Sequence, residues 1–125
     1  MSRDHEVIFY TDGRHSNVYI YEPPMDKRLY TAPIDELVDL GIDTINYAVG
    51  DCRVLLYDTK VGERWGHNLR RTNHIIWYRA ALNVEQFIAD GNDPLQIVCE
   101  RAHDLGFNFI PSLLLGMQHQ EPAEV

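Results

Sequence analysis

The feature that most constrains the fold is a short motif that occurs twice. In each copy a helical pattern ends in Asp-Leu-Gly and leads directly into an apolar segment. The copies are residues 39–42 (DLGI) and residues 104–107 (DLGF). Glycine at such a position caps a helix in the left-handed conformation, and the apolar run after it indicates a buried strand. A helix that returns to a strand in this way is the second half of a βαβ unit. The repeat therefore predicts a parallel α/β sheet, with positive φ at Gly41 and Gly106.

The rest of the chain supplies the other elements of this architecture. Asp93 and Pro94 favour a helix start, with Gln96 reaching back as in a capping box. Residues 17–22 alternate and are either a further extended segment or a loop excursion, whereas residues 52–73 have the composition of a long loop. Strands are expected at 7–10, 42–49 and 107–115, and helices at 33–40, 75–89 and 94–105.

These elements predict one α/β domain over residues 1–125, a partial (β/α) barrel-like segment with about three parallel strands and three helices. A complete barrel takes roughly 200 residues or more, so a chain of 125 residues is either a fragment or completes its sheet by self-association. Pro111 lacks an N–H, and the third strand therefore needs an edge position or a bulge there. If the helices lie on one face of the sheet, the other face is left uncovered, with Tyr47, Val49 and Phe109 or their alternates on it. An uncovered face favours a homo-oligomer, and coverage by the 52–73 loop is the next alternative.

Composition excludes several classes of partner. Eleven Lys and Arg against nineteen Asp and Glu give a formal net charge of −8, which disfavours nucleic acid and anionic membrane surfaces. No run approaches the roughly 18 apolar residues of a membrane span, and charges stand where a signal peptide would need its apolar stretch. Cys52 and Cys99 are far apart without zinc-ligand spacing, which indicates free thiols in a reducing compartment. We therefore expect a cytoplasmic protein with neither a membrane nor a nucleic-acid partner.

Candidate site residues follow the expected strands, because parallel α/β sheets bind ligands at the carboxyl ends of their strands. Asp12 follows the first strand, Asp51 the second and His119 the third. Asp12 and Asp51 suit a general acid/base pair around a glycosidic bond, although aspartate after a strand also commonly makes an Asx turn. His15 and His119 beside these aspartates are residue types that bind zinc or manganese. No H-E-x-x-H spacing supports a metal, so neither a metal nor a cofactor is expected.

The long loop holds one basic concentration in an otherwise acidic chain. This run either binds a phosphate, a carboxylate or an acidic sugar, or is a solvated segment that offsets local acidic charge. Trp65 within it either stacks on a sugar ring or anchors the loop to the core. No glycine-rich nucleotide motif and no G-x-S-x-G motif is present. The members of the run are Lys60, Arg64, His67, Arg70, Arg71 and His74.

Three stretches, VIFYTDG at 7–13, INYAVGD at 45–51 and the block at 77–116, resemble the amino-terminal region of glycoside-hydrolase-like TIM-barrel proteins, a poorly characterised group of carbohydrate-active enzymes. The most recognisable element is G-x-D-P-L at 91–95, which leads through A-H-x-L-G into the third strand. The resemblance implies an acidic turn after the first strand, matched by Asp12-Gly13, and a polar cluster after the third. His119 corresponds to part of that cluster, while its arginine and acidic residues are absent.

We therefore expect the amino-terminal part of a carbohydrate-active barrel, with glycoside hydrolase as the enzyme class. Asp12 and Asp51 are the expected catalytic residues, and His15, Trp65 and His119 are expected to contact a carbohydrate ligand. The alternative is a non-catalytic, barrel-derived binding or interaction domain. Hydrolysis of a soluble glycan that Asp12→Asn abolishes would separate the two.

Overall fold

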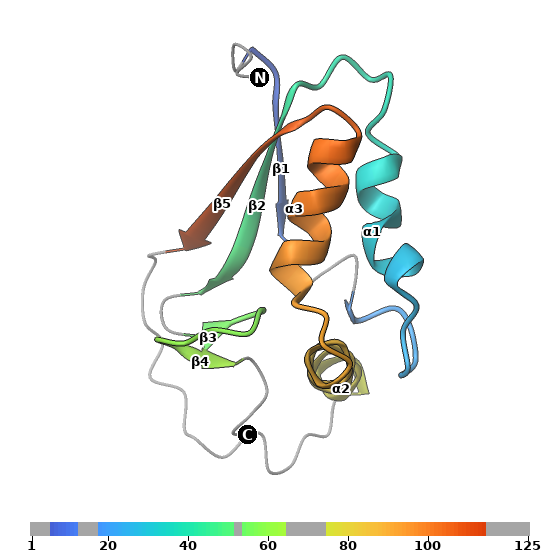
Figure 1. The fold of residues 1–125 in the computed structure, drawn as a ribbon, viewed down its shortest axis with the longest axis vertical. Helices are drawn as coiled ribbons and strands as arrows, with labels where there is room; N and C mark the ends of the chain where they lie inside the picture. Colours follow the sequence, from blue (N-terminus) through green and yellow to red (C-terminus); the bar gives the residue numbers. More distant parts are fainter. Residues whose placement is uncertain (1–5, 13–17, 52–53, 65–74, 115–125) are drawn as a thin grey trace.

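The computed structural model describes residues 6–12, 18–51, 54–64 and 75–114. Helices stand together on one side of the strands, and the short strands lie below the ends of the long ones (Figure 1). The elements in chain order are β1 (Ile8–Asp12), α1 (Lys27–Asp35), β2 (Thr44–Asp51), β3 (Val54–Leu55), β4 (Glu63–Arg64), α2 (Ile75–Ala89), α3 (Pro94–Asp104) and β5 (Asn108–Leu114).

The three longer strands form a parallel sheet in chain order, with β2 between β1 and β5. Both crossovers step in the same direction across the sheet, so right-handed connections place α1 and α3 on the same face. The predicted α/β class is confirmed, with three parallel strands and three helices. The sheet does not close into a barrel. Among the described strands β5 pairs with β2 alone, which gives Pro111 the edge position that proline requires.

The segment predicted as a long loop contains two short strands. β3 pairs antiparallel with the end of β2, Gly50 opposite Leu55 and Asp51 opposite Val54. β4 lies parallel to β3. This excursion therefore extends the sheet at the carboxyl end of β2, and the other residues of the segment, 52–53 and 65–73, lie outside the described ranges.

The predicted bounds of the first helix are wrong at both ends. The helix begins after Asp26, whose carboxylate accepts a hydrogen bond from the N–H of Arg28 at 2.7 Å, and ends at Asp35. Pro33 lies inside it, near its carboxyl end, where the missing N–H removes only one helical hydrogen bond. Turns follow over 36–40, so Gly41 has the predicted positive φ of 79° without directly capping the helix.

The other two helices follow the sequence prediction more closely. α2 has the predicted bounds, and α3 begins at Pro94 as predicted but ends one residue earlier than predicted. Asp93 caps α3 by accepting from the N–H of Leu95 at 3.2 Å, and Gly106 beyond the helix has the predicted positive φ of 86°. The predicted reach of Gln96 back to the cap is wrong, because its Nε2 donates instead to Glu100 Oε1 at 2.8 Å.

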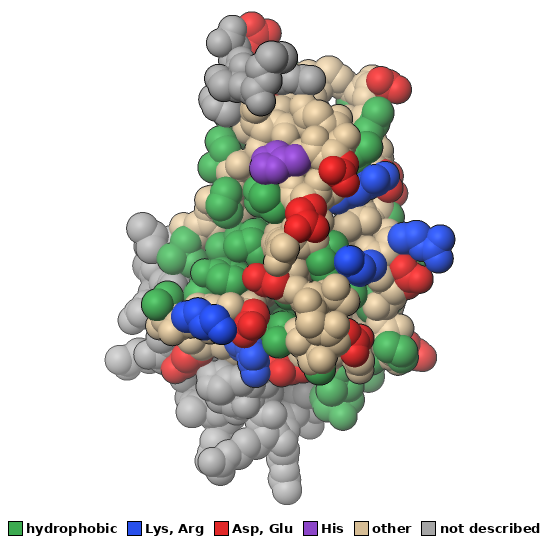
Figure 2. All heavy atoms as spheres, in the orientation of Figure 1, with side chains coloured by type: hydrophobic (Ala, Val, Ile, Leu, Met, Phe, Trp, Pro, Cys, Tyr) green, Lys and Arg blue, Asp and Glu red, His purple; other side chains and the backbone are tan. Residues whose placement is uncertain are grey.

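The hydrophobic core lies between the helices and one face of the sheet. Its most buried members come from every layer, including Ile34 of α1, Ile45 of β2 and Val98 of α3. On the outer side of this layer, charged side chains of both signs are scattered over α1 and α3, and hydrophobic side chains gather between α3 and β5 (Figure 2). The helices thus cover the centre of this face more completely than β5 at its edge, where Leu113 stays 40% exposed.

Residues 18–22 form a loop excursion, the second of the two predicted alternatives. The completely buried side chain of Asn83 on α2 binds this loop. Its Nδ2 donates to the carbonyl of Val18 at 3.0 Å and to the carbonyl of Tyr21 at 2.8 Å. One amide group therefore satisfies two loop carbonyls that have no strand to pair with.

Candidate functional site

Aromatic side chains identify the face of the sheet that the helices cover. The hydroxyl of Tyr30 on α1 lies 3.0 Å from the hydroxyl of Tyr47 on β2. The ring of Tyr47 in turn is centred 5.7 Å from the ring of Phe109 on β5. Because side chains alternate along a strand, Asn46 and Ile110 point the other way, onto the second face of the sheet.

The second face presents short side chains on β2 between longer ones on β1 and β5. The sequence prediction that Tyr47 and Val49 or their alternates lack cover is wrong on β2, since Tyr47 and Val49 are 2% and 8% exposed and the alternates Thr44 and Ala48 are 0% and 2% exposed. Among the described helices, α1 and α3 both pack on the first face, so the second face has no helix layer. Backbone register aligns its residues in three rows across β1, β2 and β5: Ile8, Thr44 and Asn108; Tyr10, Asn46 and Ile110; Asp12, Ala48 and Ser112.

Two polar atoms of this face, Asn46 Oδ1 and Ser112 Oγ, are shielded from solvent and have no hydrogen-bond partner within the described part of the chain. The row nearest the start of the strands is satisfied by contrast. There Asn108 Nδ2 donates to Thr44 Oγ1 at 3.3 Å, and Thr44 Oγ1 donates to Asp43 Oδ1 at 2.5 Å. A shielded polar group without a partner costs about 1–3 kcal/mol, so these two groups lower the stability of the described fold.

Asp12 ends β1 in the same row as Ser112, with its side chain partly exposed. Asp51 ends β2, and its backbone aligns with Leu114 of β5, while its side chain lies outside the described part of the structure. Because Asp12 aligns with Ala48, the backbones of residues 12 and 51 are roughly 11 Å apart by strand geometry. The parallel strands thus bring both positions to the carboxyl end of the sheet.

The other predicted ligand-contacting residues, His15, Trp65 and His119, lie outside the described ranges. Sequence reasoning missed the residues that the second face brings beside Asp12, namely Tyr10, Asn46 and Ser112. A signal for one of them was present, because Asn46 is a polar residue in the middle of an otherwise apolar strand pattern. Assigning it to a face required knowing which alternating set met the helices.

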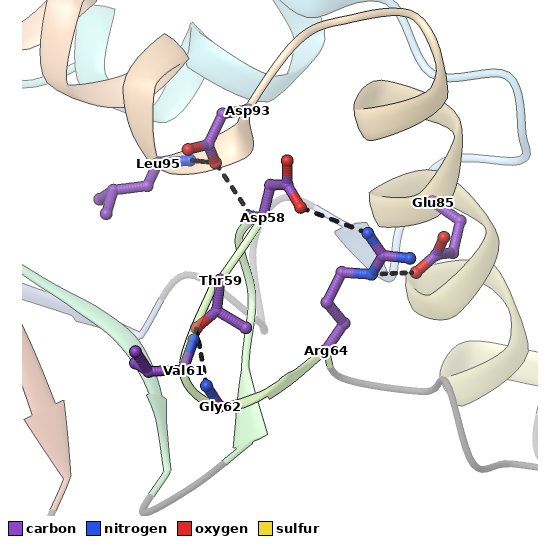
Figure 3. Close-up of polar contacts among 8 residues, drawn as sticks. All are labelled: Asp58, Thr59, Val61, Gly62, Arg64, Glu85, Asp93 and Leu95. Carbon is purple, nitrogen blue, oxygen red and sulfur yellow. Dashed lines mark hydrogen bonds and ion pairs between the residues drawn. The ribbon is translucent and has the colours of Figure 1, made fainter.

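Arg64, a member of the basic run, is held between two carboxylates (Figure 3). Its Nη1 lies 3.3 Å from Asp58 Oδ1 and its Nε lies 3.0 Å from Glu85 Oε1 of α2. The N–H of Asp58 donates to Asp93 Oδ1, at 3.3 Å, so the cap of α3 also holds this segment. These contacts tie the β3–β4 excursion to two helices, and for Arg64 they support the structural interpretation of the basic run.

Two titratable groups on the helix side, Tyr30 and Cys99, keep their protons at neutral pH. Burial, followed by the neighbouring Tyr47, raises the pKa of Tyr30 well above its usual value, so its hydroxyl stays protonated. Partial burial also raises the pKa of the Cys99 thiol, and a thiol that stays protonated is a poor nucleophile. Cys99 is a free thiol, as predicted, while Cys52 lies outside the described ranges.

Within the described ranges, no group of three or more His, Cys, Asp and Glu side chains is arranged to hold a metal ion. None of the helices that the structure describes is long and apolar enough to cross a membrane. Comparison with models of known protein families finds no match, and neither does a search of curated proteins.

Proposed function

We propose that the chain corresponds to the amino-terminal part of a carbohydrate-active, glycoside-hydrolase-like barrel and that the sugar binds at the carboxyl end of its sheet. The observation that carries the proposal is the parallel register of β1, β2 and β5, which brings the backbones of Asp12 and Asp51 to that end. Parallel α/β sheets bind ligands at the carboxyl ends of their strands, and glycoside hydrolysis uses a pair of carboxylates.

The charge of the chain supports a neutral ligand over a phosphorylated one. The formal net charge is −8, which repels anions at long range. Arg64, a cation of the loop that could bind such an anion, already forms ion pairs with Asp58 and Glu85. A neutral oligosaccharide meets neither obstacle, and the two thiols expected to be free make the cytoplasm the proposed location.

In the catalytic form of the proposal, Asp12 and Asp51 act on the glycosidic bond as a pair. One carboxylic acid donates its proton to the leaving oxygen, and the other carboxylate takes a proton from the water that attacks the anomeric carbon. In this arrangement the base stands far enough from the sugar for that water molecule to fit between them. Both products then carry the hydroxyls that hydrolysis requires.

The alternative is a non-catalytic binding domain, and one observation favours it. β1 exposes apolar side chains, including Ile8 at 52% and Tyr10 at 50%. They offer a ligand or partner apolar contacts that do not depend on the two carboxylates. Hydrolysis and binding must therefore be measured separately.

The test uses the full chain with soluble β-linked and α-linked oligosaccharides, measuring released reducing ends and, by calorimetry, binding. The catalytic form predicts hydrolysis that Asp12→Asn abolishes and the matched surface variant Asp90→Asn retains. Binding without hydrolysis would establish the binding domain instead. A chain that neither hydrolyses nor binds any oligosaccharide would contradict both forms.

A further inference from the structure

β1 forms one edge of the sheet, since among the described strands it pairs with β2 alone. The N–H of Thr44 on β2 donates to the carbonyl of Val7 at 3.2 Å. Along a strand of a parallel pair, the residues whose backbone groups bond that neighbour alternate with residues that point away from it. Odd-numbered residues of β1 therefore bond β2, and the N–H and C=O groups of Ile8 and Tyr10 point to the open edge.

The side chains of this edge are apolar and open to solvent. Val7, Ile8, Phe9 and Tyr10 are 47%, 52%, 38% and 50% exposed. Together they expose roughly 400 Å² of apolar surface, and a patch of this size on one chain often marks an interaction site. All four residue types favour strands, and the segment from Val7 to Thr11 carries no charge.

The opposite edge of the sheet is protected against a further strand. The N–H of Asn108 on β5 donates to the carbonyl of Asp43 at 2.9 Å, so even-numbered residues over 108–112 bond β2 and Pro111 points to the open edge of β5. A proline in that position offers no N–H, which is one way in which proteins prevent pairing between sheet edges. β1 contains no proline, no lysine or arginine, and no shift in its register with β2. The unprotected edge is therefore the one suited to pairing.

We infer that β1 pairs antiparallel with β1 of a second copy of the chain, across a two-fold axis at Phe9. In this register Ile8 of each copy lies opposite Tyr10 of the other, and each such pair exchanges both of its hydrogen bonds. Every outward backbone group of Ile8 and Tyr10 then has a partner. The cross-strand neighbours are Ile with Tyr and Phe9 with Phe9, which are favourable pairs.

The proline on β5 also decides in favour of a closed dimer over a fibre. Pairing of β1 with β5 of the next copy would repeat without end, because such a contact leaves the same two edges free at each step. Pro111 opposes that contact, whereas a β1 pair uses the same edge of both copies and leaves only the two protected β5 edges outside. The two sheets then join into one, with the carboxyl ends of their parallel strands pointing in opposite directions.

Area and charge set the strength of this dimer. Two patches of roughly 400 Å² bury about 800 Å² in total, below the roughly 1,200 Å² of a stable complex, so the dimer should be reversible, with a Kd in the micromolar range. Each copy has a formal net charge of −8, and Glu6 lies opposite Asp12 of the other copy at each end of the pair. Repulsion between the copies therefore opposes association, and salt should strengthen the dimer.

The test combines analytical ultracentrifugation of the full chain with amide hydrogen exchange measured by NMR over the same range of concentrations. The chain should pass from monomer to dimer and no further, and the dimer should be tighter in about 500 mM NaCl than in about 50 mM NaCl. The amides of Ile8 and Tyr10 should become protected as the dimer forms. The amides of Phe9 and Thr11, which bond β2, should be protected at every concentration.

Two substitutions at Tyr10 separate backbone pairing from general stickiness. Tyr10→Pro removes the outward N–H without removing a bond to β2, and it should weaken the dimer at least about tenfold. Tyr10→Val is the matched control, because it has a similar size, keeps the N–H and favours the strand; it should stay within about fivefold of the parent chain. Circular dichroism establishes that both variants fold, and the exchange measurement on the parent chain decides if Tyr10→Pro does not.

Four results would overturn the inference. A chain that stays monomeric up to about 500 µM would leave this edge to a strand of a different protein. Association that continues beyond the dimer would contradict the two-fold arrangement. A dimer in which the Ile8 and Tyr10 amides exchange as freely as in the monomer would place the interface elsewhere, and equal weakening by Tyr10→Val and Tyr10→Pro would show that backbone pairing does not hold the copies together.

Discussion

Replacing Ser112 with alanine removes a single oxygen atom, and the sign of its effect on stability tests whether that atom has a hydrogen-bond partner. The Oγ atom is shielded from solvent and finds no hydrogen-bond partner in the described part of the chain. Shielding such an atom without a partner costs about 1–3 kcal/mol. Because Ser112 lies on the edge strand β5 and is only partly buried, the lower end of that range applies. We expect Ser112→Ala to raise the free energy of unfolding by about 1 kcal/mol.

The assay is urea denaturation followed by far-ultraviolet circular dichroism, in which the midpoint should rise while the slope stays constant. For a chain of 125 residues, a gain of about 1 kcal/mol corresponds to a Tm increase of roughly 4 °C. Thr59→Val is the matched control, since it also removes one hydroxyl. Thr59 Oγ1 accepts from the N–H groups of Val61 at 3.2 Å and Gly62 at 3.0 Å, so this change should lower stability by about 1 kcal/mol.

A Ser112→Ala chain that unfolds more easily than the parent would mean that the hydroxyl already has a stabilising partner. That result would refute the reasoning that the shielded Oγ atom destabilises the fold.

Further outcomes follow from the core, the caps and the sheet edge. Because the pKa of buried Tyr30 is raised, only the unfolded chain ionises it as pH rises past about 10, so its contribution to stability is constant below that pH and lost above it. Tyr30→Phe should reduce the loss of stability at alkaline pH in urea titrations. An unchanged slope of unfolding free energy against pH would contradict burial of this phenol. Asn83→Leu strands the carbonyls of Val18 and Tyr21 and should lower stability by about 2 kcal/mol or more, and an unshifted denaturation midpoint would refute the clamp. Gly106→Val should cost on the order of 1 kcal/mol or more because φ is 86°, and an unchanged Tm would count against that strain. Exposed apolar residues of β1, including Phe9 at 38%, should make the chain self-associate at micromolar concentration, which Phe9→Lys should reverse; a parent chain that sediments as a monomer would rule this out.

Local signals in the sequence were enough to predict the parallel sheet and most of its helices. Both Asp-Leu-Gly segments gave glycines with positive φ followed by β2 and β5, because left-handed backbone is a local property of glycine. The first helix failed because two start signals compete in this region. Pro33 resembles a first-turn proline, yet Asp26 caps the helix earlier and Pro33 is accommodated near its end. Which of two caps is used depends on the tertiary contacts of Tyr30, which the sequence pattern does not contain.

The site residues divide along the same line. The sequence placed Asp12 and Asp51 at the carboxyl end of the sheet because the ends of parallel strands are predictable from turn residues and glycine. The unpartnered atoms of Asn46 and Ser112 were missed because they depend on which alternating set faces the helices, the set that includes Tyr47 beside Tyr30. A shift of one residue would exchange the faces. Alternation alone predicts two faces but does not identify the one that meets the helices.

The second face of β2 is polar where a parallel strand is usually apolar. Parallel strands are usually buried on both sides and carry Val, Ile and Leu on each, yet β2 contributes Thr44, Asn46 and Ala48 to this face. A β-branched apolar residue in place of Asn46 would fill the same position, favour the strand and leave no carbonyl unsatisfied. Stability alone therefore gives no reason for an amide there, and the shielding that leaves Asn46 Oδ1 without a partner also keeps it from a ligand that approaches through solvent.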